Sequence, residues 1–214
     1  MKLHIFNPEH DIALAANQER FTAPHAGRRL RTDLGFIPAF WASEGDMVLV
    51  DDVEAAIEAR RHLSKFGKDV VFVTYADLKA FAFEDVESFR VDPWGWDRTI
   101  KEQLLRANSN LRPFMPSDDT LAAIREMSSR RFAAEHLLPL LREAGEEKTV
   151  GEARYCTTME DVKQTMAQNG KSVLKSPWSS SGRGVRYVET AAPDAHLEGW
   201  AANVVKRQGG IMVE

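Results

Sequence analysis

The sequence predicts an α/β protein in two parts, and three observations lead to that prediction. Short apolar runs typical of buried strands occur at residues 3–6, 47–50 and 70–73. Between the last two, residues 51–65 place apolar side chains at helical spacing, and strand–helix–strand units of this length are typical of parallel sheets. In the second half, predicted strands at 172–175 and 185–188 are joined by a loop with no helix, which favours an antiparallel hairpin.

A boundary between the two parts is expected near residue 115. The segment Arg112-Pro-Phe-Met-Pro116 has two prolines close together and reads as a linker. We therefore expect a three-layer α/β domain with a short parallel sheet over residues 1–115. A smaller α+β subdomain with an antiparallel sheet is expected over residues 117–214.

Both parts are expected to contain several helices. In the first part we expect helices at 23–34 and 97–107, with a turn over 92–96 in which Trp94 and Trp96 cover a core. In the second part Ser117 is expected to cap a helix, and Thr157-Thr-Met-Glu160 matches a capping box. A last helix is expected at 197–207, before a strand at 211–213.

Another helix is predicted at 131–143, where apolar residues recur at helical spacing and Gly145 ends the pattern. Pro139 lies inside it and is expected to kink it. The side chains expected to face the core are Phe132, His136, Leu137, Leu140 and Leu141.

Composition excludes several classes of protein. The chain has 28 Lys and Arg against 32 Asp and Glu, so no positive excess is available for nucleic acid. The single cysteine, Cys156, excludes an internal disulfide and a multi-cysteine zinc site, and it reads as a buried apolar residue rather than a nucleophile. No apolar run approaches the roughly 18 residues of a membrane helix, and the N-terminus is polar too early for a signal peptide. A cytoplasmic protein with no membrane or nucleic-acid partner is expected.

The loop at 176–184 is the most informative feature of the sequence. It follows a strand that ends in Lys175, and it contains Ser179, Ser180, Ser181, Gly182, Arg183 and Gly184. Small side chains leave backbone N–H groups open to an anion, and Lys175 and Arg183 bring charge to the same place. No helix follows, which argues against a Walker A loop or a Rossmann fingerprint. The alternative is a plain Ser/Gly hairpin turn.

This segment resembles the ATP-grasp superfamily, in which a strand lysine and a Ser/Gly-rich loop hold ATP phosphates. The resemblance covers residues 117–214 and implies that Lys175 and the 179–184 loop bind ATP. It implies a second cationic contact at Arg130 or Arg131, without deciding between them, and places Glu214 at the adenine hinge. Residues 1–115 would correspond to the domain that precedes this module in many ligases.

The resemblance implies an ATP-dependent ligase that activates a small-molecule carboxylate as an acyl phosphate for attack by an amine or thiol. The family holds Mg²⁺ with residues that follow the hinge strand, and residues 117–214 contain no substitute acidic cluster. We therefore expect Mg²⁺ to need a further C-terminal half and this chain, as a truncated part of the enzyme, to show no ligase turnover alone.

Other polar clusters give weaker signals. Residues that follow the first predicted strand indicate a substrate site at the end of a parallel sheet, or a solvated helix-capping turn: Asn7, Glu9, His10 and Asp11. Arg28, in the run Gly27-Arg-Arg-Leu-Arg31, is a candidate for holding a carboxylate or phosphate, although a solvated helix face is favoured. His4, His10 and His25 lack metal-ligand spacing, so no metal site is expected from them.

Two alternatives to a ligase remain open. One is a non-catalytic module that binds a nucleotide in the same loop. The other is a structural or partner-binding α/β protein whose Ser/Gly loop binds nothing.

Overall fold

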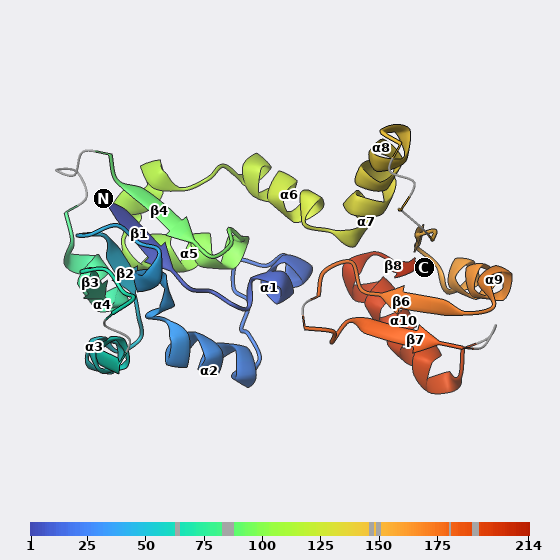
Figure 1. Cartoon of the computed structure of the whole chain (residues 1–214), viewed down its shortest axis with the longest axis horizontal. Coiled ribbons are helices and arrows are strands. Elements are labelled where there is room, and N and C mark those ends of the chain that lie inside the picture. The colour runs from blue at the N-terminus through green and yellow to red at the C-terminus, as the bar shows by residue number, and fades with distance from the viewer. Residues whose placement is uncertain (63–64, 83–87, 146–147, 149–150, 180, 190–192) are drawn as a thin grey trace. The chain divides into compact units, whose positions relative to one another are not determined.

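The structure is a computed structural model that describes residues 1–62, 65–82, 88–145, 148, 151–179, 181–189 and 193–214 (Figure 1). It forms two compact units. Unit 1 comprises residues 1–13 and 17–121, and unit 2 comprises residues 14–16 and 122–214. The units divide within helix α6 (Asp118–Met127), whose start is capped by the predicted Ser117, because the Ser117 hydroxyl accepts a hydrogen bond from the Thr120 amide.

Unit 1 contains a four-stranded sheet in the order β3-β2-β1-β4. Every pair in it is parallel, with Leu3 of β1 opposite Met47 of β2 and Val91 of β4. The strands are β1 (Lys2–Ile5), β2 (Met47–Leu49), β3 (Val71–Val73) and β4 (Arg90–Pro93). The parallel sheet predicted from the strand–helix–strand pattern is therefore confirmed.

Two apolar clusters cover the two faces of this sheet. Leu3 and Ile5 pack with Leu104 on one face, whereas Val48 and Phe72 pack on the other face, since alternate strand residues point to opposite sides. Three layers result, as predicted. The helices of unit 1 are α1 (His10–Ala16), whose residues 14–16 are grouped with unit 2, α2 (His25–Leu34), η1 (Ile37–Phe40), α3 (Val53–His62), α4 (Tyr75–Ala80), α5 (Arg98–Ala107) and η2 (Ser109–Phe114).

The turn expected at 92–96 is wrong at its start. Residues Arg90–Pro93 form strand β4, which pairs with β1. Phe89 and Val91 are buried, whereas the charged Arg90 and Asp92 next to them are exposed, and these two hide the strand in the sequence. Pro93 is tolerated because β4 is an edge strand. Trp96 packs partly against the core as expected, but Trp94 is 62% exposed and does not cover it.

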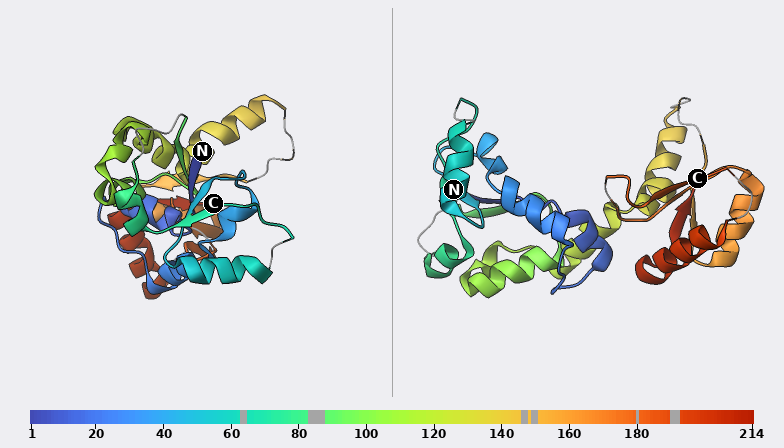
Figure 2. Two further views of the ribbon diagram at one scale, coloured as in Figure 1. Left: turned by 90° about the vertical axis from the view of Figure 1, so that its left-hand side faces the viewer. Right: turned by 90° about the horizontal axis from the view of Figure 1, so that it is seen from below.

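Unit 2 contains an antiparallel sheet in the order β5-β8-β6-β7. Helix α10 runs alongside this sheet in Figures 1 and 2, and its Ala201 and Val204 pack into the core with Ile211. The strands are β5 (Arg154–Cys156), β6 (Ser172–Lys175), β7 (Val185–Val188) and β8 (Ile211–Val213). The helices are α7 (Arg130–Phe132), η3 (Ala133–Leu137), α8 (Leu138–Glu143), α9 (Met159–Asn169) and α10 (Ala195–Gln208). The α/β fold class predicted from the sequence is thus confirmed.

The helix expected at 131–143 differs from the prediction in two ways. Its middle, η3, is a π-helical segment in which the Leu138 amide donates to the Ala133 carbonyl. This wider turn lies directly before Pro139, which has no N–H to continue the α-helical pattern. The prediction that its apolar side chains face the core is wrong: Leu137, Leu140 and Leu141 are exposed, His136 is exposed, and Phe132 is only partly buried.

The cap before α9 lies one residue later than predicted. The Thr158 hydroxyl accepts a hydrogen bond from the Asp161 amide, so Thr158 and Asp161 form the cap rather than Thr157 and Glu160. Cys156 is buried in the unit 2 core, and burial raises the pKa of its thiol, which supports its assignment as a packing residue.

Across the part of the chain that the structure describes, no helix has the length and apolarity needed to cross a lipid bilayer.

Candidate functional site

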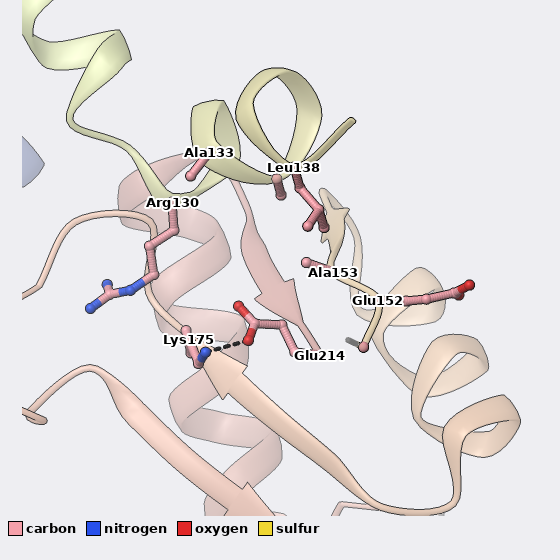
Figure 3. A pocket seen from close by; sticks show the side chains of 9 residues that line it. Arg130, Ala133, Leu138, Glu152, Ala153, Lys175 and Glu214 are labelled. Carbon is pink, nitrogen blue, oxygen red and sulfur yellow. Dashed lines mark hydrogen bonds and ion pairs between the residues drawn. The ribbon is translucent and has the colours of Figure 1, made fainter. Parts of the chain in front are cut away.

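Lys175 and Glu214 lie together on one face of the unit 2 sheet. Lys175 ends β6, and Glu214 directly follows β8, where its backbone exchanges two hydrogen bonds with Val173. Lys175 and Glu214 are therefore diagonal neighbours, and the Lys175 ammonium forms an ion pair with the Glu214 carboxylate (Figure 3). Both side chains are a little over one quarter exposed, at 28% and 29%, so this charged pair remains accessible to a ligand.

Arg130 fixes the beginning of the loop that follows Lys175. The Arg130 amide donates to the Pro177 carbonyl at 3.0 Å. Its guanidinium donates to the Ser176 carbonyl at 2.5 Å, to Ser179 Oγ at 2.8 Å and to the Ser179 carbonyl at 3.0 Å. Because Ser129 caps α7 through its hydroxyl, the start of that helix places Arg130 against the loop.

A cavity of about 420 Å³ brings these charged residues together. Its lining includes Arg130, Lys175 and Glu214, with an apolar side formed by residues such as Ala133 and Leu138. In Figure 3 the Lys175–Glu214 pair lies between these groups, while the Glu152 side chain points away from it. The cavity lining thus holds two cationic residues, Arg130 and Lys175, and two carboxylate residues, Glu152 and Glu214, beside an apolar wall.

The loop has a fixed base and an exposed tip. At the base, the Ser176 amide donates to the Gly184 carbonyl at 2.8 Å, and a Cβ on Gly184 would lie 2.2 Å from Ser179 Oγ. Gly184 is therefore required for this close approach. At the tip, Ser181, Gly182 and Arg183 are exposed, and Ser181 and Gly182 have φ angles of 53° and 71°. These three tip residues are not in the cavity lining, and Ser180 falls outside the described residues.

Arg131 lies in a different environment from Arg130. Its guanidinium forms an ion pair with Glu135 at 2.8 Å and lies 4.8 Å from the centre of the Tyr155 ring. It lines a separate hollow of about 130 Å³. Of the two arginines that the sequence left as alternatives, the structure brings Arg130, and not Arg131, to the cavity of Lys175.

Trp178 is a loop residue that the sequence analysis did not select. Its indole N–H donates to the Arg125 carbonyl at 2.8 Å, and the Arg125 guanidinium lies 3.8 Å from the ring centre. Its amide donates to Gln208 Oε1. A large aromatic residue inside a run of small ones was the available signal, because a loop that is merely flexible needs no such anchor.

In unit 1, polar side chains meet where β1 and β4 end. Asn7 donates to the Gly95 carbonyl at 2.8 Å, and His10 Nδ1 lies 3.1 Å from Asp97 Oδ2. Asp97 also caps α5 by accepting from the Ile100 amide at 2.9 Å. Asp97 was missed as a site residue, although its position before a helical pattern marked it as a cap.

The remaining predicted residues of unit 1 are not gathered into this network. Glu9 pairs with Arg31 at 2.8 Å, and Arg28, the candidate for holding a substrate carboxylate or phosphate, is exposed. No side-chain hydrogen bond or ion pair of Asp11 with another described residue was found. Burial raises the pKa of Glu9 although the Arg31 charge opposes that rise.

The histidines lie in separate surroundings. His4 is buried with Asp46 and Asp92 at 3.1 Å each, while His10 contacts Asp97. Within the described residues, no group of three or more His, Cys, Asp or Glu side chains is arranged to hold a metal ion.

Comparison with known proteins gives limited matches. No family model matches the chain, and no curated protein sequence matches it. Among solved structures, the chain is similar to a RimK domain ATP-grasp protein from Sphaerobacter thermophilus DSM 20745, with 21% sequence identity and a TM-score of 0.39. The match covers 81% of this chain and 63% of that one, so this chain spans less than two thirds of that protein's length.

Proposed function

We propose that unit 2 binds the phosphates of ATP and that the chain supplies this nucleotide-holding part of an ATP-dependent carboxylate–amine or carboxylate–thiol ligase. The observation that carries the proposal is that Arg130 and Lys175 line one cavity, while the Arg130 guanidinium also holds Ser176 and Ser179 at the base of the loop that follows Lys175. Charged donors and open backbone amides are the groups that bind phosphate most strongly.

Each residue has a defined role in this proposal. Lys175 donates to phosphate oxygens, and Glu214 holds its ammonium at the edge of the cavity until the nucleotide competes for it. Arg130 holds Ser179 and adds positive charge beside Lys175. Glu214 also marks the adenine end of the site, because the ATP-grasp resemblance places the hinge there.

The exposed tip of the loop suits a cover that closes over bound phosphates. Ser181, Gly182 and Arg183 are exposed, and they carry backbone N–H donors and the guanidinium donors of Arg183. We propose that ATP enters as its Mg²⁺ complex, since the metal neutralises part of the phosphate charge.

Calorimetric titration of the chain with MgATP tests the proposal. Saturable binding of ATP, with much weaker binding of AMP, is expected because the site recognises the distal phosphates. Lys175→Ala is expected to weaken binding about tenfold or more, whereas Lys171→Ala, an exposed lysine before the same strand, is the matched control. Equal binding by both variants would remove Lys175 from the site.

The same samples test whether the chain acts alone. We expect no release of ADP, because the residues gathered here bind phosphate, and none of them is placed to activate a phosphoryl acceptor. ADP release by the purified chain would contradict that expectation while leaving the binding result unaffected.

A further inference from the structure

A second cavity, in unit 1, has the features of a site for an organic anion. Its volume is about 400 Å³, and it is lined by Arg31, Tyr75, Gln103, Arg106 and Ala107. This volume lies within the range of about 300–1,000 Å³ that small-molecule sites occupy. All four polar side chains in the lining carry hydrogen-bond donors, and no carboxylate is among them.

The fold positions these donors from three helices. Arg31 lies in the last turn of α2, and Tyr75 begins α4 directly after β3 ends. Gln103 and Arg106 are three residues apart on α5 and so share one helix face. Ligands of open parallel sheets bind beyond the carboxyl ends of the strands, which is where Tyr75 lies.

Two of the donors are held in place by hydrogen bonds. The Tyr75 hydroxyl donates to Gln103 Oε1 at 3.1 Å, which leaves the amide nitrogen of Gln103 to donate elsewhere. Arg31 donates to Glu9 Oε1 at 2.8 Å, and the Glu9 side chain is only 10% exposed. Arg31 and Gln103 also line a small adjoining hollow with Glu9, so Glu9 lies directly behind the cavity.

Two buried polar atoms beside this cavity lack a hydrogen-bond partner among the described residues. Among buried side-chain atoms, Glu9 Oε2 and Arg31 Nε have no hydrogen-bond partner in the structure. Arg106 is exposed, and among the described residues it forms no ion pair. A cavity with one unneutralised guanidinium and a buried, incompletely satisfied Glu–Arg pair is arranged for a polar ligand.

The charges around the cavity favour an anion of single charge. The pKa of Tyr75 is raised to about 12, mainly by burial, with smaller upward effects of the carboxylates of Asp51, Glu9 and Asp97 and an opposing effect of Arg31. Tyr75 is therefore a neutral donor at ordinary pH. The same three carboxylates would repel a dianion more strongly than a monoanion.

We propose that this unit 1 cavity binds the carboxylate group of a small organic monoanion. Arg106 pairs with the carboxylate through its planar guanidinium, Gln103 donates to it, and Ala107 contacts the apolar part of the molecule. The site is separate from the ATP site of unit 2 and does not depend on it.

The test is an NMR titration of the whole chain with butyrate, butyramide and inorganic phosphate as probes. Butyramide has nearly the shape of butyrate but no charge. We expect butyrate to shift the Gln103 side-chain amide signals saturably, and butyramide and phosphate to bind at least about tenfold more weakly. Equal shifts with butyramide, tighter binding of phosphate, or no saturable shift with butyrate would each overturn the proposal.

Two variants locate the binding within unit 1. Arg106→Met is expected to weaken butyrate binding about tenfold, whereas Arg98→Met, an exposed arginine on the same helix, leaves it unchanged. Lys175→Ala also leaves it unchanged, so failure at the ATP site and failure here are separable. Wild-type affinity in Arg106→Met would overturn the assignment of this cavity.

Discussion

At the scale of single residues, the structure distinguishes two neighbouring arginines that the sequence alone could not. Arg130 contacts the loop after β6 and lines the cavity of Lys175, while Arg131 is paired with Glu135 and stacks near Tyr155. The difference arises because adjacent residues of a helix point in different directions, at 3.6 residues per turn. Two identical neighbours in the sequence do not show which of them faces the loop.

Substitution of the two arginines tests this assignment. Arg130→Ala is expected to weaken MgATP binding about tenfold, because it removes a charged donor and releases Ser179. Arg131→Ala is the matched control and is expected to change affinity by less than about threefold. Calorimetry decides between them, and a larger loss in Arg131→Ala would reverse the assignment.

Gly184 is the second residue whose role can be tested. Gly184→Ala places a Cβ 2.2 Å from Ser179 Oγ and 2.4 Å from Ser179 Cβ, so Ser179 must move away from Arg130. We expect weaker ATP binding and a loss of about 1–3 kcal/mol in the free energy of unfolding.

Gly199→Ala provides the control for that substitution. Gly199 lies inside α10, and a Cβ there meets nothing within 4 Å. It should stabilise the protein by up to about 1 kcal/mol and leave ATP binding unchanged. Chemical denaturation of both variants measures the difference, and equal stability in the two would show that the loop base tolerates a side chain.

The contribution of Asp46 to the stability of the fold is expected to depend on pH. Burial alone would raise its pKa, but hydrogen bonds from the Ser43 and Lys2 amides and the contact with His4 outweigh burial and lower it. A carboxyl whose folded-state pKa is lowered stabilises the fold above its unfolded pKa, and that contribution is lost as pH falls through the folded pKa.

Asp46→Asn is therefore expected to cost about 1–2 kcal/mol of unfolding free energy at neutral pH. The difference from wild type should shrink as the pH falls below about 4, where the unfolded aspartate becomes protonated. Asp33→Asn, at an exposed position, is the control. A difference that stays constant down to the acid transition would show that Asp46 stabilises the fold by packing alone.

At the scale of secondary-structure elements, local patterns predicted most of unit 2. Strands β6, β7 and β8 and helix α10 lie close to their expected positions, because each has regular apolar spacing and clear turn residues at its ends. Both faces of unit 1's sheet are covered, so β1 and β2 read as continuous apolar runs and were also found.

The elements that were missed or misread depend on tertiary contacts. Within strand β4 only Val91 is buried, with Phe89 buried directly before the strand, so its polar residues concealed the strand pattern. In the 131–143 segment, apolar spacing predicted a buried face, but Leu137, Leu140 and Leu141 are exposed. Periodicity shows that a helix has an apolar side, and it does not show what covers that side.

In the candidate site, too, local features could be predicted from the sequence and tertiary contacts could not. Lys175 and the glycines of the loop could be predicted because they are adjacent in the sequence and their chemistry is local. The ion pair with Glu214 and the contact of Arg130 with Ser179 could not, since they join residues far apart in the chain. In unit 1 the pairing of Glu9 with Arg31 joins residues that are far apart in the chain, so it could not be predicted either.

At the scale of the whole molecule, the chain consists of two units with separate apolar cores. Leu104 is fully buried in unit 1 and Met166 is fully buried in unit 2. Truncation of such a residue to alanine removes apolar contacts and costs about 2–5 kcal/mol in the unit that contains it.

Denaturation of core variants tests this division. Leu104→Ala is expected to lower the transition of unit 1 and to leave ATP binding by unit 2 intact under conditions where unit 2 is folded. Met166→Ala should abolish ATP binding at a lower denaturant concentration than in wild type. A single transition that shifts equally in both variants would show that the two cores unfold as one.

The central claim is that Lys175 and its cavity bind ATP through the phosphates, and calorimetric titration with MgATP tests it most directly. The account predicts saturable binding by the wild-type chain and by Lys171→Ala, and binding about tenfold weaker or lost in Lys175→Ala. No binding by the wild-type chain at millimolar MgATP, or equal affinity in wild type and Lys175→Ala, would contradict it.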